Sequence, residues 1–393
     1  MAAIKPSQIL TIKNIALLLL CMFSVAAHLG GPIFYGVLII YVIYNITGIK
    51  GKKKYHSFTV CFILIAYISL LVNFSDTEKI FRPEQRSIML TLVLFAFSPL
   101  ITNVGIYKYR KNLFFFLLFA ISITSLISSC EGLFLYQGFI DGYLVGLYDF
   151  PNSLGYAQGL TIIVLFSIIA IVPKRIKYLC FLGILITIVA IPRTGTRTAF
   201  YSLPIIILGY AFLKSTSFGK FFNIVLMFIL FSSIFFNYVK LDTAIIDRKN
   251  ETQQAEGNSR KALWNARMIE FNQSPIIGFG TFRADLRYAI VNKNGNIEAG
   301  NSFLMMLSMN GLLGFLNFCL LYLSILIPFI KHIISNRKYG LSHFEIMLSL
   351  VLFYNFISMQ QMGLLLNSGL YFTGINWLTL ALAYKFKSFN QKR

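Results

Sequence analysis

Residues 303–330 read FLMMLSMNGLLGFLNFCLLYLSILIPFI, without one charged side chain among them. A helix that crosses a bilayer needs about 20 apolar residues in succession, so this stretch is long enough to span a membrane. A backbone in lipid has no water to bond with, and its polar groups must be satisfied within a helix or a closed barrel. The stretch therefore predicts a transmembrane helix.

Eleven further apolar blocks lie along the chain, which is 57% hydrophobic and only 12% charged. A soluble chain carries about a quarter charged residues. We therefore predict an all-α polytopic membrane protein with about twelve transmembrane helices, folded as a single membrane domain over residues 1–393. The predicted spans are residues 10–28, 31–48, 57–74, 87–104, 112–129, 153–172, 178–192, 198–213, 221–238, 303–330, 342–359 and 366–383.

The basic residues alternate with the spans and indicate the orientation of the chain. If the N-terminus is cytoplasmic, 21 of the 35 basic residues fall in cytoplasmic segments, together with a single acidic residue, Glu345. Cytoplasmic loops of membrane proteins carry this excess of lysine and arginine. We expect both termini in the cytoplasm, and the pattern accounts for the net charge of +21 without a nucleic-acid partner.

Cysteine and histidine point to no metal or disulfide chemistry. The five cysteines form no close-spaced pair, and the four histidines form no metal-binding motif. We expect neither a metal nor a cofactor.

Residues 239–301 form the one outer segment long enough to hold structure of its own. Within it, SRKALWNARMIEFNQSP (259–275) predicts a helix that begins at a capping serine or asparagine and ends at proline. Arg260, Trp264, Arg267 and Phe271 would share one side of this helix. They could rest on the membrane domain while the arginines snorkel to water, or they could form a lid over an anionic substrate.

A second pair of arginines lies in the segment IPRTGTRTAF (191–200), an outer turn that carries Arg193 and Arg197. A charged side chain beside the hydrocarbon region is costly and marks a functional candidate, although contact with lipid headgroups is the alternative. The planar guanidinium forms paired hydrogen bonds with phosphate oxygens. The turn and the loop helix together could clamp a lipid diphosphate.

Several pieces of the sequence, taken in order, resemble the O-antigen ligase/O-antigen polymerase superfamily of bacterial envelope glycan assembly. The resemblance covers roughly residues 149–315. Its pieces are Phe150-Pro151-Asn152 before a span, Thr196-Arg197-Thr198, Arg260 and Trp264 in a long outer loop, Ser274-Pro275 followed by Gly278 and Gly280, and Gly300-Asn301-Ser302 followed by Gly311 and Gly314.

One position departs from this pattern. The ligases of the superfamily carry a histidine directly before the Asn-Ser of the last piece, where this chain has Gly300. The downstream spacing to Gly311 is intact, so only the imidazole is missing. The resemblance therefore favours the polymerase (Wzy-type) branch over the ligase (WaaL-type) branch.

The resemblance implies a GT-C-like architecture and a metal-independent glycosyltransferase on the periplasmic side of the bacterial inner membrane. It would join repeat units carried on undecaprenyl diphosphate into an O-antigen or capsule polysaccharide. The partners would be these lipid-linked glycans, membrane lipid and a chain-length-regulating copolymerase.

The resemblance and the residues together suggest roles for eight side chains. Arg197 and Arg260 would bind the diphosphate, and Glu298 would be the base, with Asp149, Glu131 and Asp242 as alternatives. The substrate contacts would be Arg193, Arg267, Trp264, Asn152 and Asn301.

Two other functions compete with polymerisation. An O-antigen ligase would perform the same chemistry on a lipid A–core acceptor, and Gly300 argues against it. A flippase for lipid-linked oligosaccharides would also have about twelve spans. Transporters often show related halves and charged or broken helices at the midplane, whereas this chain has one large loop and outer charges.

Overall fold

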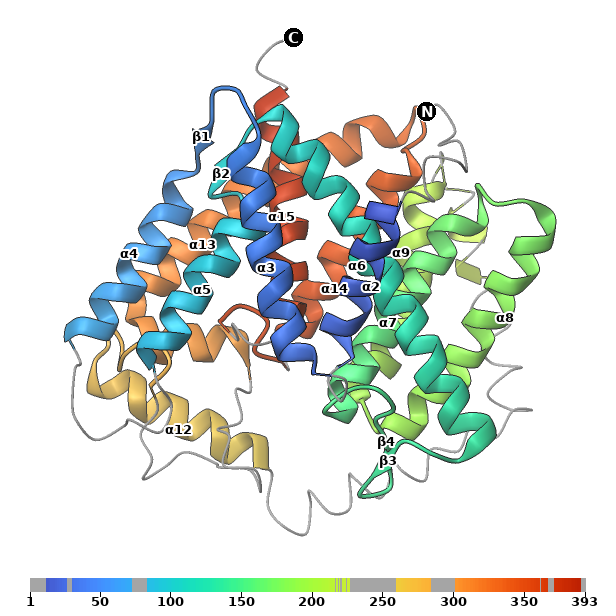
Figure 1. Ribbon diagram of the computed structural model, residues 1–393, viewed down its shortest axis with the longest axis horizontal. Coiled ribbons are helices and arrows are strands. Elements are labelled where there is room, and N and C mark those ends of the chain that lie inside the picture. The colour runs from blue at the N-terminus through green and yellow to red at the C-terminus, as the bar shows by residue number, and fades with distance from the viewer. Residues whose placement is uncertain are drawn as a thin grey trace.

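The computed structural model describes residues 12–26, 30–72, 83–215, 217, 219, 221–223, 225–226, 259–283, 301–360, 362–366 and 371–389. These residues are mostly helical (Figure 1). In chain order the α-helices are α2 (Ile12–Val25), α3 (Gly31–Gly48), α4 (Ser57–Val72), α5 (Pro83–Phe97), α6 (Val104–Cys130), α7 (Pro151–Ile169), α8 (Lys174–Ala190), α9 (Arg197–Lys214), α12 (Ser259–Gln273), α13 (Ser302–Arg337), α14 (His343–Ser358) and α15 (Tyr371–Phe389).

Two short helices and two small antiparallel sheets complete the described part. The π-helix η3 (Glu131–Leu135) extends α6, and the 3-10 helix η4 (Ile191–Thr194) extends α8. The sheets pair β1 (Lys54–Tyr55) with β2 (Ile101–Thr102) and β3 (Phe139–Ile140) with β4 (Tyr143–Leu144).

Eleven of the twelve predicted spans coincide with a helix, and the twelfth, residues 221–238, lies largely outside the described residues. Five described helical segments are long and apolar enough to cross a membrane, and three shorter helices are also apolar. The all-α polytopic class is therefore confirmed. The five segments are Gly31–Gly48, Val104–Leu135, Pro151–Ile169, Lys174–Thr194 and Ser302–Arg337.

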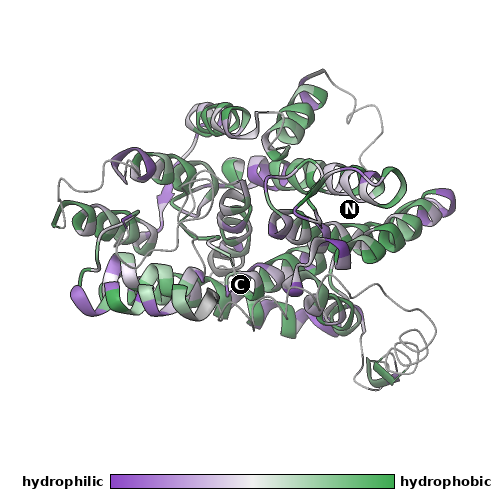
Figure 2. Cartoon of the chain, turned by 90° about the horizontal axis from the view of Figure 1, so that it is seen from below, coloured by the Kyte–Doolittle hydropathy of each residue, from purple (hydrophilic) through white to green (hydrophobic). Residues whose placement is uncertain are grey.

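The helices run between two ends of the molecule. In Figure 1, β1 and β2 lie at one end, and α12 lies at the other together with β3 and β4. Seen from below in Figure 2, most helices are hydrophobic along their length, whereas hydrophilic residues concentrate toward helix ends and on α12. The basic segment around Lys54 and α12 thus lie at opposite ends of the molecule (Figure 1).

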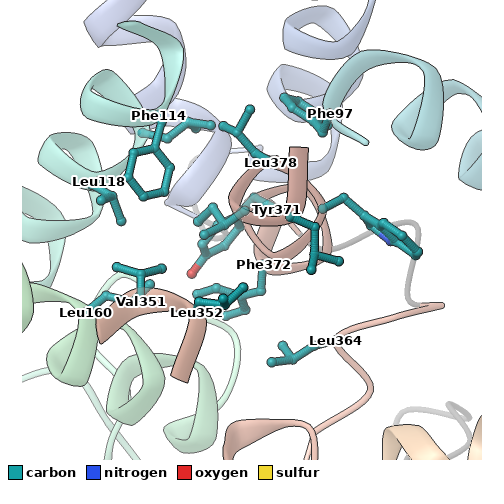
Figure 3. Close-up of a cluster of buried hydrophobic side chains, with 14 of the residues drawn as sticks. Phe97, Phe114, Leu118, Leu160, Val351, Leu352, Leu364, Tyr371, Phe372 and Leu378 are labelled. Atoms are coloured by element: carbon teal, nitrogen blue, oxygen red, sulfur yellow. The ribbon is translucent and has the colours of Figure 1, made fainter. Parts of the chain in front are cut away.

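The core lies where α15 packs against its neighbours. Figure 3 shows Tyr371, Phe372 and Leu378 of α15 among apolar side chains of α5, α6, α7 and α14. Trp377 is fully buried, and its indole nitrogen donates to the Leu365 carbonyl at 3.2 Å. This packing sets α7 and α14 side by side, which matters for the site below.

The predicted span 87–104 is wrong at its C-terminal end. Helix α5 ends at Phe97, and Ile101 and Thr102 leave the helix to pair with β1. The side chain of Arg110 explains this early end, because it is buried within α6 and donates to three carbonyl oxygens at the end of α5 and in β2. These carbonyls belong to Phe95 (3.0 Å), Ala96 (3.0 Å) and Ile101 (2.8 Å).

We expect Arg110→Ala to lower the free energy of unfolding by about 3 kcal/mol, because hydrogen bonds to a charged group contribute about 1.5–3 kcal/mol each and the carbonyls would stay buried. The thermal midpoint of the purified protein in detergent measures this. Arg175→Ala is the control, since that arginine is exposed at the start of α8. Equal midpoints for the two variants would refute the capping role.

Candidate functional site at the ends of α7, α9 and α14

Helix α13 is broken at Gly311, and the loop after α12 fills the break. Gly311 has φ 62° and ψ −168°, which is not helical. The broken turn would leave backbone groups of α13 without partners. Four hydrogen bonds replace the lost helical ones: Phe279 N to Ser308 O (2.8 Å), Gly280 N to Met309 O (3.1 Å), Leu312 N to Pro275 O (2.8 Å) and Leu313 N to Ile276 O (3.1 Å).

The two chain segments cross at a pair of glycines. A Cβ on Gly278 would collide with the backbone of Met309 and Gly311, and a Cβ on Gly311 would collide with Ile276 and Gly278. Thr281, just beyond the crossing, donates to the Ala66 carbonyl of α4 at 2.8 Å. The spacing Gly278-x-Gly280 therefore serves a close backbone approach that fastens α12 to the membrane domain.

Helix α12 confirms the predicted loop helix, but its buried side differs from the predicted one. The buried residues are Leu263, Ala266, Arg267 and Glu270. Of the four residues predicted to share one side, Arg267 is buried, Phe271 is half-buried and Trp264 is 42% exposed, so this side does not rest on the membrane domain along its whole length. The burial of Glu270 beside Arg267 was not predicted, because a buried carboxylate was not expected on an outer loop.

Arg267 forms a buried ion pair with Glu270, with Nη1 to Oε2 at 2.8 Å. Their side chains are only 4% and 2% exposed. Removing one partner of such a pair costs about 3–5 kcal/mol, whereas replacing both by apolar residues is often tolerated. The pair thus gives Arg267 a structural partner besides its predicted role as a substrate contact.

We expect Arg267→Leu and Glu270→Leu each to lower the thermal midpoint, and the double variant to recover most of the loss. Double-mutant analysis of detergent-purified protein measures the coupling. Additive losses in the double variant would show that the two side chains do not depend on each other.

The turn that carries the other two arginines is anchored on the end of α6. Arg193, in η4, donates from Nη1 to the Gly132 carbonyl at 2.8 Å. Its guanidinium also lies 5.5 Å from the ring centroid of Tyr136. Both partners belong to η3 or to the residue that ends it, so this π-helix holds Arg193 in place. Single-turn π-helices of this kind occur frequently at functional sites.

Arg197 is the first residue of α9 rather than part of the turn, which corrects the predicted start of that span at residue 198. Thr196 precedes it as the N-cap, and its hydroxyl donates to the Pro151 carbonyl at 3.0 Å. A Cβ on Gly155 would collide with the Thr196 side chain. The first turn of α7 and the first turn of α9 are thus packed directly together.

A narrow cleft lies at this junction. Its lining is mostly polar. Helix α7 contributes Asn152 and Tyr156, the start of α9 contributes Thr196 and Thr198, and the end of α14 contributes Tyr354 and Ser358. The N-termini of two helices meet here, and each carries a partial positive charge that favours anions. Arg197 lies in the sequence between two of these lining threonines, Thr196 and Thr198.

The segment that begins α13 is bound to the chain just after α14. Asn301 caps α13 by accepting from the amides of Phe303 (2.8 Å) and Leu304 (3.3 Å). The Ser302 amide donates to the Met359 carbonyl at 2.8 Å, and its hydroxyl donates to the Met362 carbonyl. Met362 also lines the cleft. Ser302 therefore connects the start of α13 to the cleft, because it bonds to the lining residue Met362.

The predicted site residues thus divide into groups. Asn152 and the two neighbours of Arg197, Thr196 and Thr198, line the cleft. Arg193 lies in η4, just before the start of α9, and Asn301 caps the start of α13. Arg267 and Trp264 lie on α12, which packs on α13. Arg260 is on the first turn of α12, its side chain outside the described part, and Glu298 and Gly300 are outside the described residues.

The sequence reasoning missed Tyr354 and Ser358. One signal was available: Tyr354, Asn355 and Ser358 form a polar cluster at the C-terminal end of the predicted span 342–359. Polar residues within a span are costly and can mark a functional site. Among the described residues, no group of three or more histidine, cysteine, aspartate or glutamate side chains could hold a metal ion.

Residues 182–319, about a third of the chain, match a protein-family model described as O-antigen ligase. The match supports the O-antigen ligase and polymerase superfamily that the order of motifs predicted. It includes the Arg197 turn, α12 and the broken part of α13, and it ends before α14. No curated protein matches the chain.

Proposed function

We propose that this member of the O-antigen ligase and polymerase superfamily is a polymerase that joins lipid-linked repeat units into a surface polysaccharide. The observation that carries the proposal is the meeting of the N-termini of α7 and α9 beside a polar cleft, with Arg197 as the first residue of α9. Such an arrangement suits a diphosphate, because helix N-termini and guanidinium groups both bind phosphate oxygens.

The proposed reaction needs orientation and charge stabilisation more than covalent catalysis. The acceptor hydroxyl oxygen bonds to the anomeric carbon of the donor while the bond from that carbon to the diphosphate oxygen breaks. The electron pair leaves with the diphosphate, and the hydroxyl proton passes to a base or to the departing phosphate. Arg197 would offset the negative charge that develops on the diphosphate, and holding both substrates in place would supply much of the acceleration.

Two further residues have proposed roles. Arg260, on the first turn of α12, would approach the diphosphate from the large loop, and Glu298 would accept the acceptor proton. The docking of α12 through Gly278 and Gly311 supports the first role, because it holds the loop helix against the membrane domain. The active site would face the periplasm, since α12 lies at the end opposite the basic β1 region (Figure 1).

O-antigen ligation is the second candidate, and the description of the matching family model favours it. Gly300 argues against ligation, because the ligases carry a histidine at this position. Both reactions use the same donor and differ in the acceptor, which is a second lipid-linked repeat unit for the polymerase and lipid A–core for the ligase.

Deletion of the gene, followed by complementation, separates the candidates. Loss of a polymerase leaves core carrying a single repeat unit, visible as one band above core on a gel of the surface glycan. Loss of a ligase leaves long polymer on the carrier lipid. Loss of a flippase leaves repeat units on the cytoplasmic leaflet and no capped core. We expect the first result, and either of the other two would contradict the proposal.

A further inference from the structure

The end of α14 holds buried polar groups that the described protein does not satisfy. Ser358 is 1% exposed and lines the cleft; its hydroxyl lies beside that of Tyr354 but reaches hydrogen-bond geometry with no described residue. Asn355, fully buried behind the cleft, accepts from the Tyr156 hydroxyl, while its Nδ2 has no partner among the described residues. The Tyr354 hydroxyl beside Ser358 donates to the Tyr156 and Gly155 carbonyls at 3.3 and 3.4 Å.

Unsatisfied polar groups are costly inside a membrane domain. A buried donor or acceptor without a partner costs about 1–3 kcal/mol, and the bilayer supplies no water to replace the missing bond. An apolar side chain would fit the surrounding span better at each of these positions. The presence of Ser358 in the lining is explained if something that enters the cleft completes its hydrogen bonds.

The lining of the cleft indicates a neutral, hydroxyl-bearing group. Besides Met362 and Ala199, the lining consists of hydroxyl groups and the Asn152 amide, which both donate and accept hydrogen bonds. No lining residue is charged. The cleft is narrow, so it suits one substituent of a sugar better than a whole ring.

We propose that this cleft recognises a hydroxyl group of the sugar attached to the donor diphosphate, with Ser358 and Tyr354 as specificity-determining residues. The inference rests on the proposed function, because Arg197, beside Thr196 and Thr198, places the diphosphate next to the cleft. A site built to bond a substrate hydroxyl discriminates strongly against a ligand that lacks it, since its own polar groups then stay unpaired.

The test measures the affinity of the full-length protein in nanodiscs for two lipids. One lipid is undecaprenyl diphosphate, and the other is the undecaprenyl-diphosphate-linked repeat unit extracted from the deletion strain. The wild-type protein should bind the glycan-bearing lipid more tightly than the bare lipid. Ser358→Ala should reduce that preference by about fivefold to tenfold, the value of one net hydrogen bond, and should leave the affinity for the bare lipid unchanged.

Ser349→Ala is the matched control, because that hydroxyl lies on the same helix and donates to the Glu345 carbonyl at 2.7 Å. It should keep the full preference. Ser358→Ala should melt near the wild-type temperature, since the neighbouring Tyr354 hydroxyl keeps its bonds to two backbone carbonyls. Ser358→Thr adds a methyl group in the cleft and should also reduce the preference.

The outcomes distinguish a failure of the sugar-hydroxyl inference from a failure of the proposed function. A wild-type preference that Ser358→Ala and Ser358→Thr leave intact overturns the inference and leaves the diphosphate site standing. Equal wild-type affinity for both lipids also overturns it. If the wild-type protein binds neither lipid, the proposed function itself fails.

Discussion

Replacing Arg197 by alanine should lower the rate of polymerisation on the order of 10²-fold, the loss typical of removing one group that stabilises developing charge. Arg197 begins α9 beside two threonines of the cleft, at the meeting point of two helix N-termini. In the proposed reaction a positive charge at this place would stabilise the departing diphosphate more than the bound donor, so the effect should appear in kcat.

Arg197→Lys should recover only part of the activity, because lysine keeps the charge but lacks the planar fork that binds two phosphate oxygens. The measurement is the chain-length ladder of the surface glycan, with protein abundance followed on blots. Arg175→Ala, at the exposed start of α8, serves as the control and should give a wild-type ladder. Long polymer from Arg197→Ala at normal abundance would exclude Arg197 from the reaction.

Gly311→Ala should destabilise the protein by more than about 3 kcal/mol. Its backbone conformation, φ 62° and ψ −168°, is strained for any residue with a Cβ, and such strain alone costs about 1–3 kcal/mol. The new Cβ would also collide with Ile276 and Gly278. The four hydrogen bonds between residues 275–280 and α13 would weaken with that shift.

Thermal unfolding in detergent and protein abundance in membranes measure this effect. Gly36→Ala is the matched control, because it lies inside α3 with nothing near its Cβ position and has no positive φ. It should melt at or slightly above the wild-type temperature, since alanine favours a helix over glycine. A Gly311→Ala protein as stable as Gly36→Ala would show that the crossing tolerates a side chain.

The spans could be predicted because a helix that crosses the bilayer needs a certain length and an apolar composition. Both can be recognised within one continuous segment of the sequence. Eleven predicted spans coincide with helices for this reason. The loop helix could also be predicted from its own segment. A capping residue at its start and Pro275 after its end place both ends of α12 to within two residues.

Features that depend on distant partners could not be predicted. The early end of α5 depends on Arg110 in the next helix, and the break in α13 depends on a loop some 30 residues earlier. The buried side of α12 depends on the packing of this helix against α13. In each case the outcome is decided only once two elements pack.

The sequence by itself determined an all-α membrane fold, a resemblance to the O-antigen ligase and polymerase superfamily, and the segment that carries Arg193 and Arg197. These follow from apolar lengths, charge distribution and short motifs, each of which acts within one segment. Only the tertiary structure joined Asn152, the start of α9 and the end of α14 into one cleft. That assembly depends on helix packing, because the Gly155–Thr196 contact and the position of Ser358 arise between segments that are far apart in the chain.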